Sequence, residues 1–523
     1  MFFSETNKME YKVHDNFIFF PVNRSVSRKK LTFKRNGEFL FSLNVAIDYV
    51  TPNFTAKIDL SRFKGETLEI TVAPEIPLNF TSSDTDFREE CEEPFRPTVH
   101  FSPRFGWMND PNGLIKYGDE YHMFFQHNPT DTAWTNMHWG HAVSKDLIRW
   151  EEKEVAVFPD KLGVAFSGSA ITDKDNLLGL KEGDDDTVLL FYTSVGVPAC
   201  QSIAYSTDGL KSFKKYSDNP VIGHIIGCNR DPKVNFCEEL GEYVVVFYLN
   251  DDVYVLQKSK NLKDWTEFQR ISLPGDNECP DIFPINDKNG KRKWVLIGAH
   301  DKYFVGDFIK GEFVPTQPVQ SLHYGTSAYA GQTFQGIDDG RRIRIDWLRA
   351  PGICGKNFCS QMSFPTELTL DSVNNTYYLS ANPVSELSTL YRKTDSFENL
   401  ILEKNVPFTF GLEDAAYYVT LSGKFDFDTT LKFSYFGREF DISMSGNEIK
   451  SKSLNGPVSV DEKSLDIKLI IDRTSLEIYS DAGKIYYGNV NESTICDRNL
   501  PTLGITSDND YTLDKLEIIS LKI

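Results

Sequence analysis

The chain has 523 residues, which exceeds the size at which one hydrophobic core keeps growing, so its length predicts two or three domains. Hydrophobic residues make up 40% and charged residues 25%, which is ordinary for a compact protein. The 56 basic and 75 acidic residues give a formal charge of -19, which repels phosphate backbones and anionic membrane surfaces and argues against a nucleic-acid partner.

The N-terminal sequence shows no export signal. Charged residues interrupt residues 1–17, where a signal peptide would need about seven to fifteen consecutive apolar residues. Apolar runs such as 244–249 are far shorter than the roughly 18 residues of a membrane-spanning helix. The 8 cysteines have neither the spacing of a disulfide scaffold nor that of a zinc site. We therefore expect a cytoplasmic protein with reduced thiols, no membrane partner and no metal.

Residues 1–92 contain short runs with the composition of β-strands. Examples are LTFKRNGEFLFSLNVAI at 31–47 and ETLEITVAP at 66–74, followed by an acidic connector at 84–93. This pattern predicts a small β-sandwich-like module over residues 1–92.

A phrase that ends on an aromatic residue recurs in the middle of the chain, at Ser144–Trp150, Ser206–Phe213 and Ser259–Trp265. Each copy follows an apolar strand, and a repeat of about 50 to 60 residues is typical of the four-stranded blades of a β-propeller. Equivalent strand starts fall near Asp110, Ser167, Asp231, Glu278 and Tyr324. The spacing predicts a five-bladed β-propeller over residues 96–365.

Short strands return from residue 385 to the end of the chain, for example at 466–479 and 514–523. They predict a C-terminal β-sandwich over residues 385–523. The expected fold is therefore all-β, with a propeller between an N-terminal and a C-terminal β-sandwich.

Three acidic residues stand where inner propeller strands are expected to begin. Asp110 lies in WMNDPNG, Asp231 in RDP and Glu278 in ECP. Inner strands line the central channel of a propeller, so the three carboxyl groups are expected to converge. Cleaving a glycosidic bond requires one carboxyl group that protonates the departing oxygen and another that attacks or activates water. Each motif alone is more often a turn, but the matched set indicates a glycosidase site.

Sequence neighbours predict different environments for these carboxyl groups. Arg230 precedes Asp231 and is expected to keep it ionised. An apolar Cys-Pro pair follows Glu278 and is expected to raise its pKa toward the value of a general acid. The Pro-Asn-Gly that follows Asp110 is expected to end the strand and to let a sugar approach the backbone.

Over about residues 96–523 the chain resembles glycoside hydrolase family 32, the invertases, inulinases and levanases. The resemblance is carried by HFSPRFGWMNDPNG, FFQHNP, MHWGHAVSKDLIRW, FSGSA, QSIAYSTDG, RDPKV, ECPDIF, YFVGDF and IDRTSLEIYSDAGK. It implies a five-bladed propeller joined to a C-terminal β-sandwich. The N-terminal module resembles, more faintly, a module of some bacterial levanase-like members and implies packing against the propeller or sugar binding.

The resemblance implies that Asp110 is the nucleophile of a covalent fructosyl-enzyme and that Glu278 is the acid/base, so that configuration is retained. Asp231 would hold fructose hydroxyls. The resemblance further implies fructose contacts from Asn109, Gln126, Arg230, Phe166 and Ser167, and apolar walls from Trp134 and Trp347. No cofactor is implied.

Two departures from the family pattern concern the leaving sugar. Residues 323–330 read HYGTSAYA where many relatives read DYGKDFYA, so an Asp and a Lys associated with the leaving sugar of invertases are absent. Asn277 replaces an aromatic residue often found before the Glu-Cys pair. Both departures favour short fructans over sucrose as substrates, and we expect exo-acting release of fructose from them.

Other readings of the sequence stay open. A sucrose-specific invertase and a fructosyltransferase would use the same covalent intermediate, and a fructan-binding protein would lack catalysis. Linkage preference, exo or endo action and the oligomeric state, including a homo-oligomer, are not determined by the sequence. His138 and His141 are expected to make structural hydrogen bonds rather than bind a metal, and Cys279 is expected to pack behind Glu278.

Overall fold

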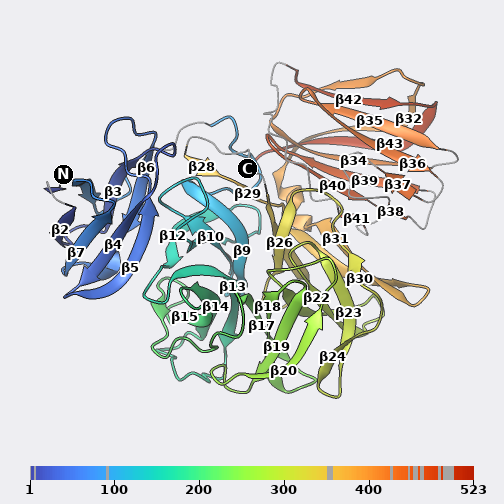
Figure 1. Cartoon of the computed structure of the whole chain (residues 1–523). Helices are drawn as coiled ribbons and strands as arrows, with labels where there is room; N and C mark the ends of the chain where they lie inside the picture. Colours follow the sequence, from blue (N-terminus) through green and yellow to red (C-terminus); the bar gives the residue numbers. More distant parts are fainter. Residues whose placement is uncertain are drawn as a thin grey trace.

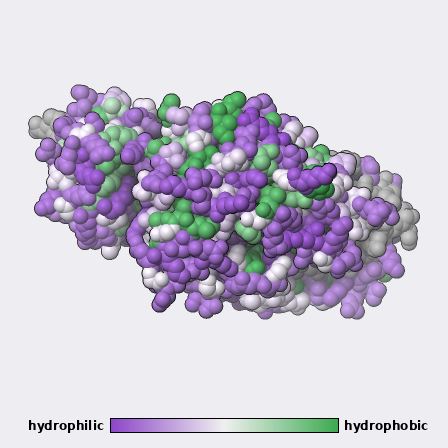
Figure 2. Space-filling model, turned by 90° about the horizontal axis from the view of Figure 1, so that it is seen from below, coloured by the Kyte–Doolittle hydropathy of each residue, from purple (hydrophilic) through white to green (hydrophobic). Residues whose placement is uncertain are grey.

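Short β-strands joined by tight turns make up nearly the whole of the computed structural model (Figure 1). The structure describes residues 2–4, 7–89, 93–349, 357–424, 428–445, 448–450, 458–459, 464–480, 485–486 and 500–523. In these residues no helix is long and apolar enough to cross a membrane. One face of the molecule is mostly hydrophilic with scattered apolar areas (Figure 2).

The N-terminal module consists of two four-stranded sheets that enclose one core. One sheet has the order β1 (Phe2–Ser4), β8 (Leu78–Ser83), β3 (Phe17–Val22), β6 (Phe54–Asp59), and the other β2 (Lys8–Lys12), β7 (Thr67–Ala73), β4 (Lys29–Arg35), β5 (Glu38–Val45). Asn36 and Gly37 join β4 to β5 with φ of 50° and 79°, the backbone that a two-residue hairpin turn requires.

Five sheets follow one another along the chain and form the propeller. Their strands are β9 (Gly106–Tyr117), β10 (Glu120–Asn128), β11 (His138–Ser144) and β12 (Glu151–Val157); β13 (Val164–Asp173), β14 (Thr187–Val195), β15 (Cys200–Ser206) and β16 (Lys214–Lys215); β17 (Arg230–Cys237), β18 (Glu242–Asn250), β19 (Val253–Ser259) and β20 (Thr266–Ser272); β21 (Asp281–Asn286), β22 (Arg292–Ile297), β23 (Lys302–Ile309), β24 (Glu312–Pro315) and β25 (Gln320–Ser321); and β26 (Ala328–Thr333), β27 (Arg342–Leu348), β30 (Thr366–Val373) and β31 (Thr376–Pro383). The predicted all-β fold with a five-bladed propeller is confirmed. The fifth sheet extends past residue 365, where the sequence prediction ends the propeller.

The recurring aromatic phrase forms the turn after the third strand of the first three blades. Each turn contains a buried leucine with positive φ: Leu147 at 66°, Leu210 at 64° and Leu262 at 63°. In the first and third copies the closing tryptophan donates its indole N–H to that leucine's carbonyl, at 2.8 Å and 3.1 Å. The repeat therefore encodes a left-handed turn that an aromatic ring covers.

A short segment near the end of the propeller connects its first and fifth blades. β28 (Phe358–Cys359) pairs in parallel with Gly106 and Trp107 of β9, and β29 (Gln361–Met362) pairs with β27. Cys359 is disulfide-bonded, so the prediction that every thiol is reduced is wrong for this residue. Its spacing from the other cysteines gave no signal of a disulfide scaffold, whereas Cys200, Cys228, Cys237 and Cys279 are free.

The C-terminal sandwich consists of two six-stranded sheets around a separate core. The first contains β32 (Tyr391–Leu402), β43 (Tyr511–Leu521), β34 (Ala416–Lys424), β39 (Ser464–Ile471), β40 (Leu476–Ser480) and β41 (Ile485–Tyr486). The second contains β33 (Phe408–Gly411), β42 (Thr502–Ser507), β35 (Thr429–Tyr435), β36 (Arg438–Ser445), β37 (Glu448–Lys450) and β38 (Val458–Ser459).

A buried ionic cluster joins the sandwich to the propeller. Asp472 accepts hydrogen bonds from the backbone N–H groups of Thr98 and Val99 at 2.8 to 2.9 Å, and its Oδ2 lies 2.8 Å from His100 Nδ1. Glu477 lies 3.5 Å from the other ring nitrogen of His100. Burial opposes a charge on His100, but the two carboxylates raise its pKa to about 9, so the ring is an imidazolium held between two anions.

Candidate active site

Two of the three candidate carboxyl groups, which are distant in sequence, lie beside one thiol, and an arginine connects the third to them. The Cys279 Sγ lies 3.5 Å from Asp110 Oδ2 and 3.5 Å from Asp231 Oδ2. Arg230 lies between Asp231, 3.6 Å from Oδ2, and Glu278, 2.5 Å from Oε1. The expected convergence of side chains from three blades is therefore present, and Cys279 lies between the two aspartates rather than behind Glu278.

Bulges in the inner strands aim these side chains. In β9, Pro111 pairs with Phe125 and Met108 with His127, so Asn109 and Asp110 both stand opposite Gln126 alone. A bulge adds one residue to a strand and redirects its side chain, which is why bulges are frequent beside active sites.

The same irregularity recurs around the ring, at Ser167 in β13, at Asp231 in β17 and after Tyr329 in β26. Asp110 lies inside strand β9, which continues to Tyr117. The prediction that the Pro-Asn-Gly sequence ends the strand is therefore wrong. Gly113 is required for packing rather than for sugar approach, because a Cβ there would lie 2.9 Å from the Phe124 ring.

The backbone of the site is strained at its acidic residues. Asp231, Glu278 and Cys279 have φ of 66°, 58° and 32°, a region that costs non-glycine residues on the order of 1–3 kcal/mol each. Hydrogen bonds hold this conformation: the Cys279 N–H donates to Asp231 Oδ2 at 3.1 Å, and the Asp231 N–H donates to Thr193 Oγ1 at 2.9 Å. Strain that is fixed in this way is typical of a preorganised site.

Asp110 is held by two polar neighbours. The Ser167 hydroxyl donates to its Oδ2 at 2.7 Å, and the Asn109 side chain is a second hydrogen-bond partner. The Trp107 indole N–H fixes Asn109 by donating to its Oδ1 at 2.7 Å. Burial raises the pKa of Asp110, the two hydrogen bonds oppose that rise, and the nearby Glu278 carboxylate adds to it.

The pKa shifts of the other two acids are opposite to those predicted from their sequence neighbours. Burial raises the pKa of Asp231 to about 7, although the Arg230 cation opposes the shift. For Glu278, burial also acts to raise the pKa, but the Tyr329 hydroxyl and Arg230 outweigh it and the net pKa is lowered. The reason is geometric. The Arg230 guanidinium lies closer to Glu278 of the neighbouring blade than to Asp231, which lowers the pKa of Glu278, while the Asp231 side chain is only 4% exposed, so burial dominates its pKa.

Four of the other predicted fructose contacts lie beside the carboxyl cluster. With the Asn112 amide oriented to satisfy its neighbours, its oxygen accepts from Gln126 Nε2 at 3.0 Å and its nitrogen donates to Ser167 Oγ at 3.3 Å. Gln126 and Ser167 are thus connected to Asp110 through one polar network. Asn109 and Arg230 contact the acids directly.

The predicted aromatic walls lie on two sides. Trp134 is 54% exposed and contacts Phe166 edge to face, with ring centroids 5.8 Å apart. The ring centroid of Trp347 lies 6.1 Å from that of Trp107 and 6.2 Å from that of Tyr329. The contact with Tyr329 places Trp347 on the Glu278 side of the site. Exposed Trp134 and half-buried Trp347 therefore offer apolar faces of the kind that a sugar ring contacts.

Tyr329 and Trp107 are site residues that were not predicted from the sequence. Tyr329 lies in HYGTSAYA and Trp107 opens WMNDPNG, so both stood inside stretches that were already singled out. Asn112 also lies in WMNDPNG, whereas Thr193 carries no motif of its own and reaches the site through strand pairing.

His138 contacts the Asn136 carbonyl at 2.5 Å, and His141 contacts His122. These hydrogen bonds agree with the structural interpretation of both histidines. No group of three or more metal-ligating side chains occurs in the described ranges.

Comparisons with known proteins point to one family. Residues 100–383 match the family described as "Glycosyl hydrolases family 32 N-terminal domain". The levanase of Bacillus subtilis is 32% identical over 77% of this chain and 67% of its own length, and the invertase of Schizosaccharomyces pombe is 30% identical over 80% of both chains. The crystal structure of an exo-inulinase from Aspergillus awamori superposes with a TM-score of 0.74 at 24% identity, covering 83% of this chain and 99% of that one.

Proposed function

The chain belongs to glycoside hydrolase family 32 and is a β-fructofuranosidase-type hydrolase, and we propose that it releases terminal fructose from short fructans with Asp110 as nucleophile and Glu278 as acid/base. The observation that carries this proposal is the meeting of Asp110, Asp231 and Glu278 around Cys279 and Arg230.

In the first step the Asp110 carboxylate attacks the anomeric carbon of fructose while Glu278 donates its proton to the departing oxygen. The bond to the leaving sugar breaks and a fructosyl ester forms on Asp110. In the second step Glu278 takes a proton from water, the hydroxide attacks the same carbon, and Asp110 is released. Two inversions give retention of configuration. Hydrogen bonds from Ser167 and Asn109 orient Asp110 for both attacks.

The pKa shifts run against the protonation states that the first step needs, because ionised Asp110 is disfavoured by a raised pKa and protonated Glu278 by a lowered one. In the molecules that do react, Asp110 is the more basic nucleophile and Glu278 the stronger acid. The same shifts reduce the fraction of molecules in which Asp110 is ionised while Glu278 is protonated. The Glu278 side chain is 35% exposed, which gives the acid/base access to the leaving group and to water.

Asp231 is suited to hold fructose hydroxyls rather than to react. Its pKa of about 7 leaves it largely protonated in mildly acidic solution, and a protonated carboxyl group both donates and accepts hydrogen bonds. Neutral Asp231 also places no second negative charge beside Asp110.

The substrate preference rests on the relatives and on the leaving-group side. The relatives are a levanase, an invertase and an exo-inulinase. Residues 323–330 lack the Asp and Lys associated with sucrose, and Asn277 lies beside Tyr329 rather than forming an aromatic wall. We assign short fructans as the preferred substrates.

A substrate panel with product analysis tests this function. Initial rates of fructose release are compared for sucrose and for inulin-type and levan-type oligosaccharides, with Asp110→Asn as the inactive control. Fructose as the main product, and higher kcat/KM for a fructan than for sucrose, are expected. Transfer of fructose to a sugar acceptor would indicate a fructosyltransferase, and parent-like rates in Asp110→Asn would disprove the proposed nucleophile.

A further inference from the structure

A cavity of about 670 Å³ lies between the N-terminal module and the first two blades, away from the carboxyl cluster. Its walls come from β6 and the turn after it, from β10, β11 and β12 of the first blade, and from residues 209–213 of the second. Its volume falls in the range of about 300–1,000 Å³ that is usual for small-molecule sites.

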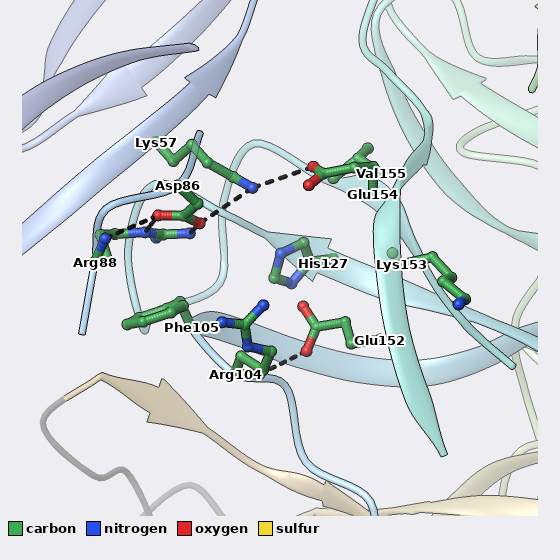
Figure 3. A pocket seen from close by; sticks show the side chains of 11 residues that line it. Lys57, Asp86, Arg88, Arg104, Phe105, His127, Glu152, Lys153, Glu154 and Val155 are labelled. Carbon is green, nitrogen blue, oxygen red and sulfur yellow. Dashed lines mark hydrogen bonds and ion pairs between the residues drawn. The ribbon is translucent and has the colours of Figure 1, made fainter. Parts of the chain in front are cut away.

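A smaller cavity of about 260 Å³ shares Lys153, Glu154 and Val155 with it (Figure 3). There Lys57 of the module pairs with Asp86 at 3.3 Å and with Glu154 of the first blade at 3.2 Å. Arg88 forms a two-pronged pair with Asp86. These charges already satisfy one another, so the smaller cavity is a contact that fixes the module to the propeller.

The larger cavity contains a pair of histidines with unused hydrogen-bonding capacity. His122 Nδ1 and His141 Nε2 are 3.0 Å apart, and among the described residues the two rings hydrogen-bond only to each other. Burial lowers the pKa of His122 to about 4 and that of His141 well below its usual value, so both are neutral. Whichever ring donates, one N–H donor and one acceptor nitrogen remain. A hydroxyl group is both a donor and an acceptor and complements such a pair.

The charged side chains of the cavity balance one another: Arg62, Lys153 and Lys211 are basic, and Asp59, Glu120 and Glu154 are acidic. This balance favours neither an anion nor a cation. The Arg62 guanidinium covers the Phe158 ring at 4.2 Å and donates one long hydrogen bond, of 3.4 Å, to the Asp59 carbonyl. Within the described ranges it pairs with no carboxylate, so further N–H donors are available to a ligand.

Aromatic rings complete the lining. Phe17 of the module, Phe158 of the first blade and Phe213 of the second all border the cavity. Phe213 contacts His141 edge to face at 5.6 Å, which sets an apolar ring beside the polar histidine pair. Lys57 Nζ lies 4.6 Å from the centroid of the Phe17 ring and Arg62 covers Phe158, so these rings present apolar carbon next to cations and to neutral donors and acceptors, a mixture that suits the C–H groups and hydroxyls of a sugar.

We propose that this cavity is a second carbohydrate-binding site, separate from the catalytic one, which holds a segment of a short fructan between the N-terminal module and the propeller. The proposal rests on the function proposed above, because fructans are the neutral, hydroxyl-rich molecules on which that function acts. The N-terminal module thereby contributes to substrate capture as well as to packing.

The test measures binding of inulin-type and levan-type oligosaccharides to full-length Asp110→Asn by isothermal titration calorimetry. Two sites are expected. Ser61→Trp, which fills the cavity from an exposed position, removes the second site, whereas Ser61→Ala at the same position keeps it. Arg62→Ala weakens the second site about tenfold. Lys211 lines the cavity from the second blade, and Lys211→Ala is expected to weaken the second site too. If thermal unfolding shows that Ser61→Trp is misfolded, the affinity of Lys211→Ala for the oligosaccharides is the measurement that decides.

A single binding event that Ser61→Trp and Arg62→Ala leave unchanged overturns the proposal. A second site that binds maltooligosaccharides as tightly as fructans overturns the assignment of the ligand. Fructose release by the parent enzyme is measured separately. Absence of release with cavity binding intact would therefore count against the proposed function and not against the second site.

Discussion

The hydroxyl of Tyr329 donates a hydrogen bond of 2.6 Å to Oε2 of Glu278. This bond stabilises the ionised carboxylate and lowers its pKa together with Arg230. In Tyr329→Phe the pKa of Glu278 therefore rises, and the limb of the kcat/KM profile that reports Glu278 moves to higher pH. Tyr254→Phe is the matched control, because the Tyr254 hydroxyl contacts the Glu278 backbone carbonyl at 3.2 Å and not the carboxyl group. Equal profiles for the two variants would contradict this role of Tyr329.

Removing the acid/base should be rescued by the leaving group. Glu278→Gln is expected to lower kcat/KM for a fructan by about 10²- to 10⁴-fold, the usual contribution of general acid catalysis. A fructoside whose leaving group departs without protonation should recover most of the lost rate of fructosyl-enzyme formation. Burst kinetics measure that step. No recovery would show that Glu278 does not protonate the departing oxygen.

Asp231 should determine a limb of the pH profile near neutrality. As pH rises through about 7, Asp231 loses its proton and adds a negative charge beside Asp110 and Glu278, so kcat/KM of the parent is expected to fall. Asp231→Asn keeps a neutral amide at every pH and should lack this limb, with a rate at pH 5 reduced by about 10²-fold through weaker hydroxyl binding. A limb near pH 7 that persists in Asp231→Asn would assign it to another group.

The His100 cluster predicts a loss of stability in alkaline solution. The pKa of His100 rises from 6.5 in the unfolded chain to about 9 in the fold, so its contribution is complete below pH 6.5 and is lost as pH rises through 9. That contribution amounts to about 3 kcal/mol. Urea unfolding of the parent and of His100→Asn at pH 6 and pH 9.5 isolates this contribution: His100→Asn should be less stable than the parent at pH 6, and the difference between the two proteins should shrink by about 3 kcal/mol at pH 9.5.

The blades could be predicted because each of the first three carries the same local signal. A serine, a left-handed leucine and a covering aromatic ring specify the turn after each third strand without reference to the rest of the fold. The fifth blade has no such phrase, and between β27 and β30 the chain forms β28, which joins the sheet of the first blade, and β29, which pairs with β27 outside the main strand order. The two outer strands of the fifth blade, β30 and β31, therefore lie beyond residue 365, where the sequence prediction ends the propeller.

The site residues could be named from the sequence, but their electrostatics could not. Arg230 is the neighbour of Asp231 along the chain, yet its shortest contact is with Glu278 on the next blade. The bulges at Asp110, Ser167 and Asp231 likewise arise from pairing between strands, which periodicity along one strand does not reveal.

The parallel pairing of β28 with Gly106 and Trp107 gives the ring a seam that runs beside the catalytic strand. Main-chain hydrogen bonds between the first and the last blade are few, although both blades contribute side chains to one hydrophobic cluster, while within the first blade the strands pair over most of their length. We expect mild denaturant to open the molecule first at this seam. Enzymatic competence would then disappear while most of the amide protons in the second, third and fourth blades are still protected from exchange.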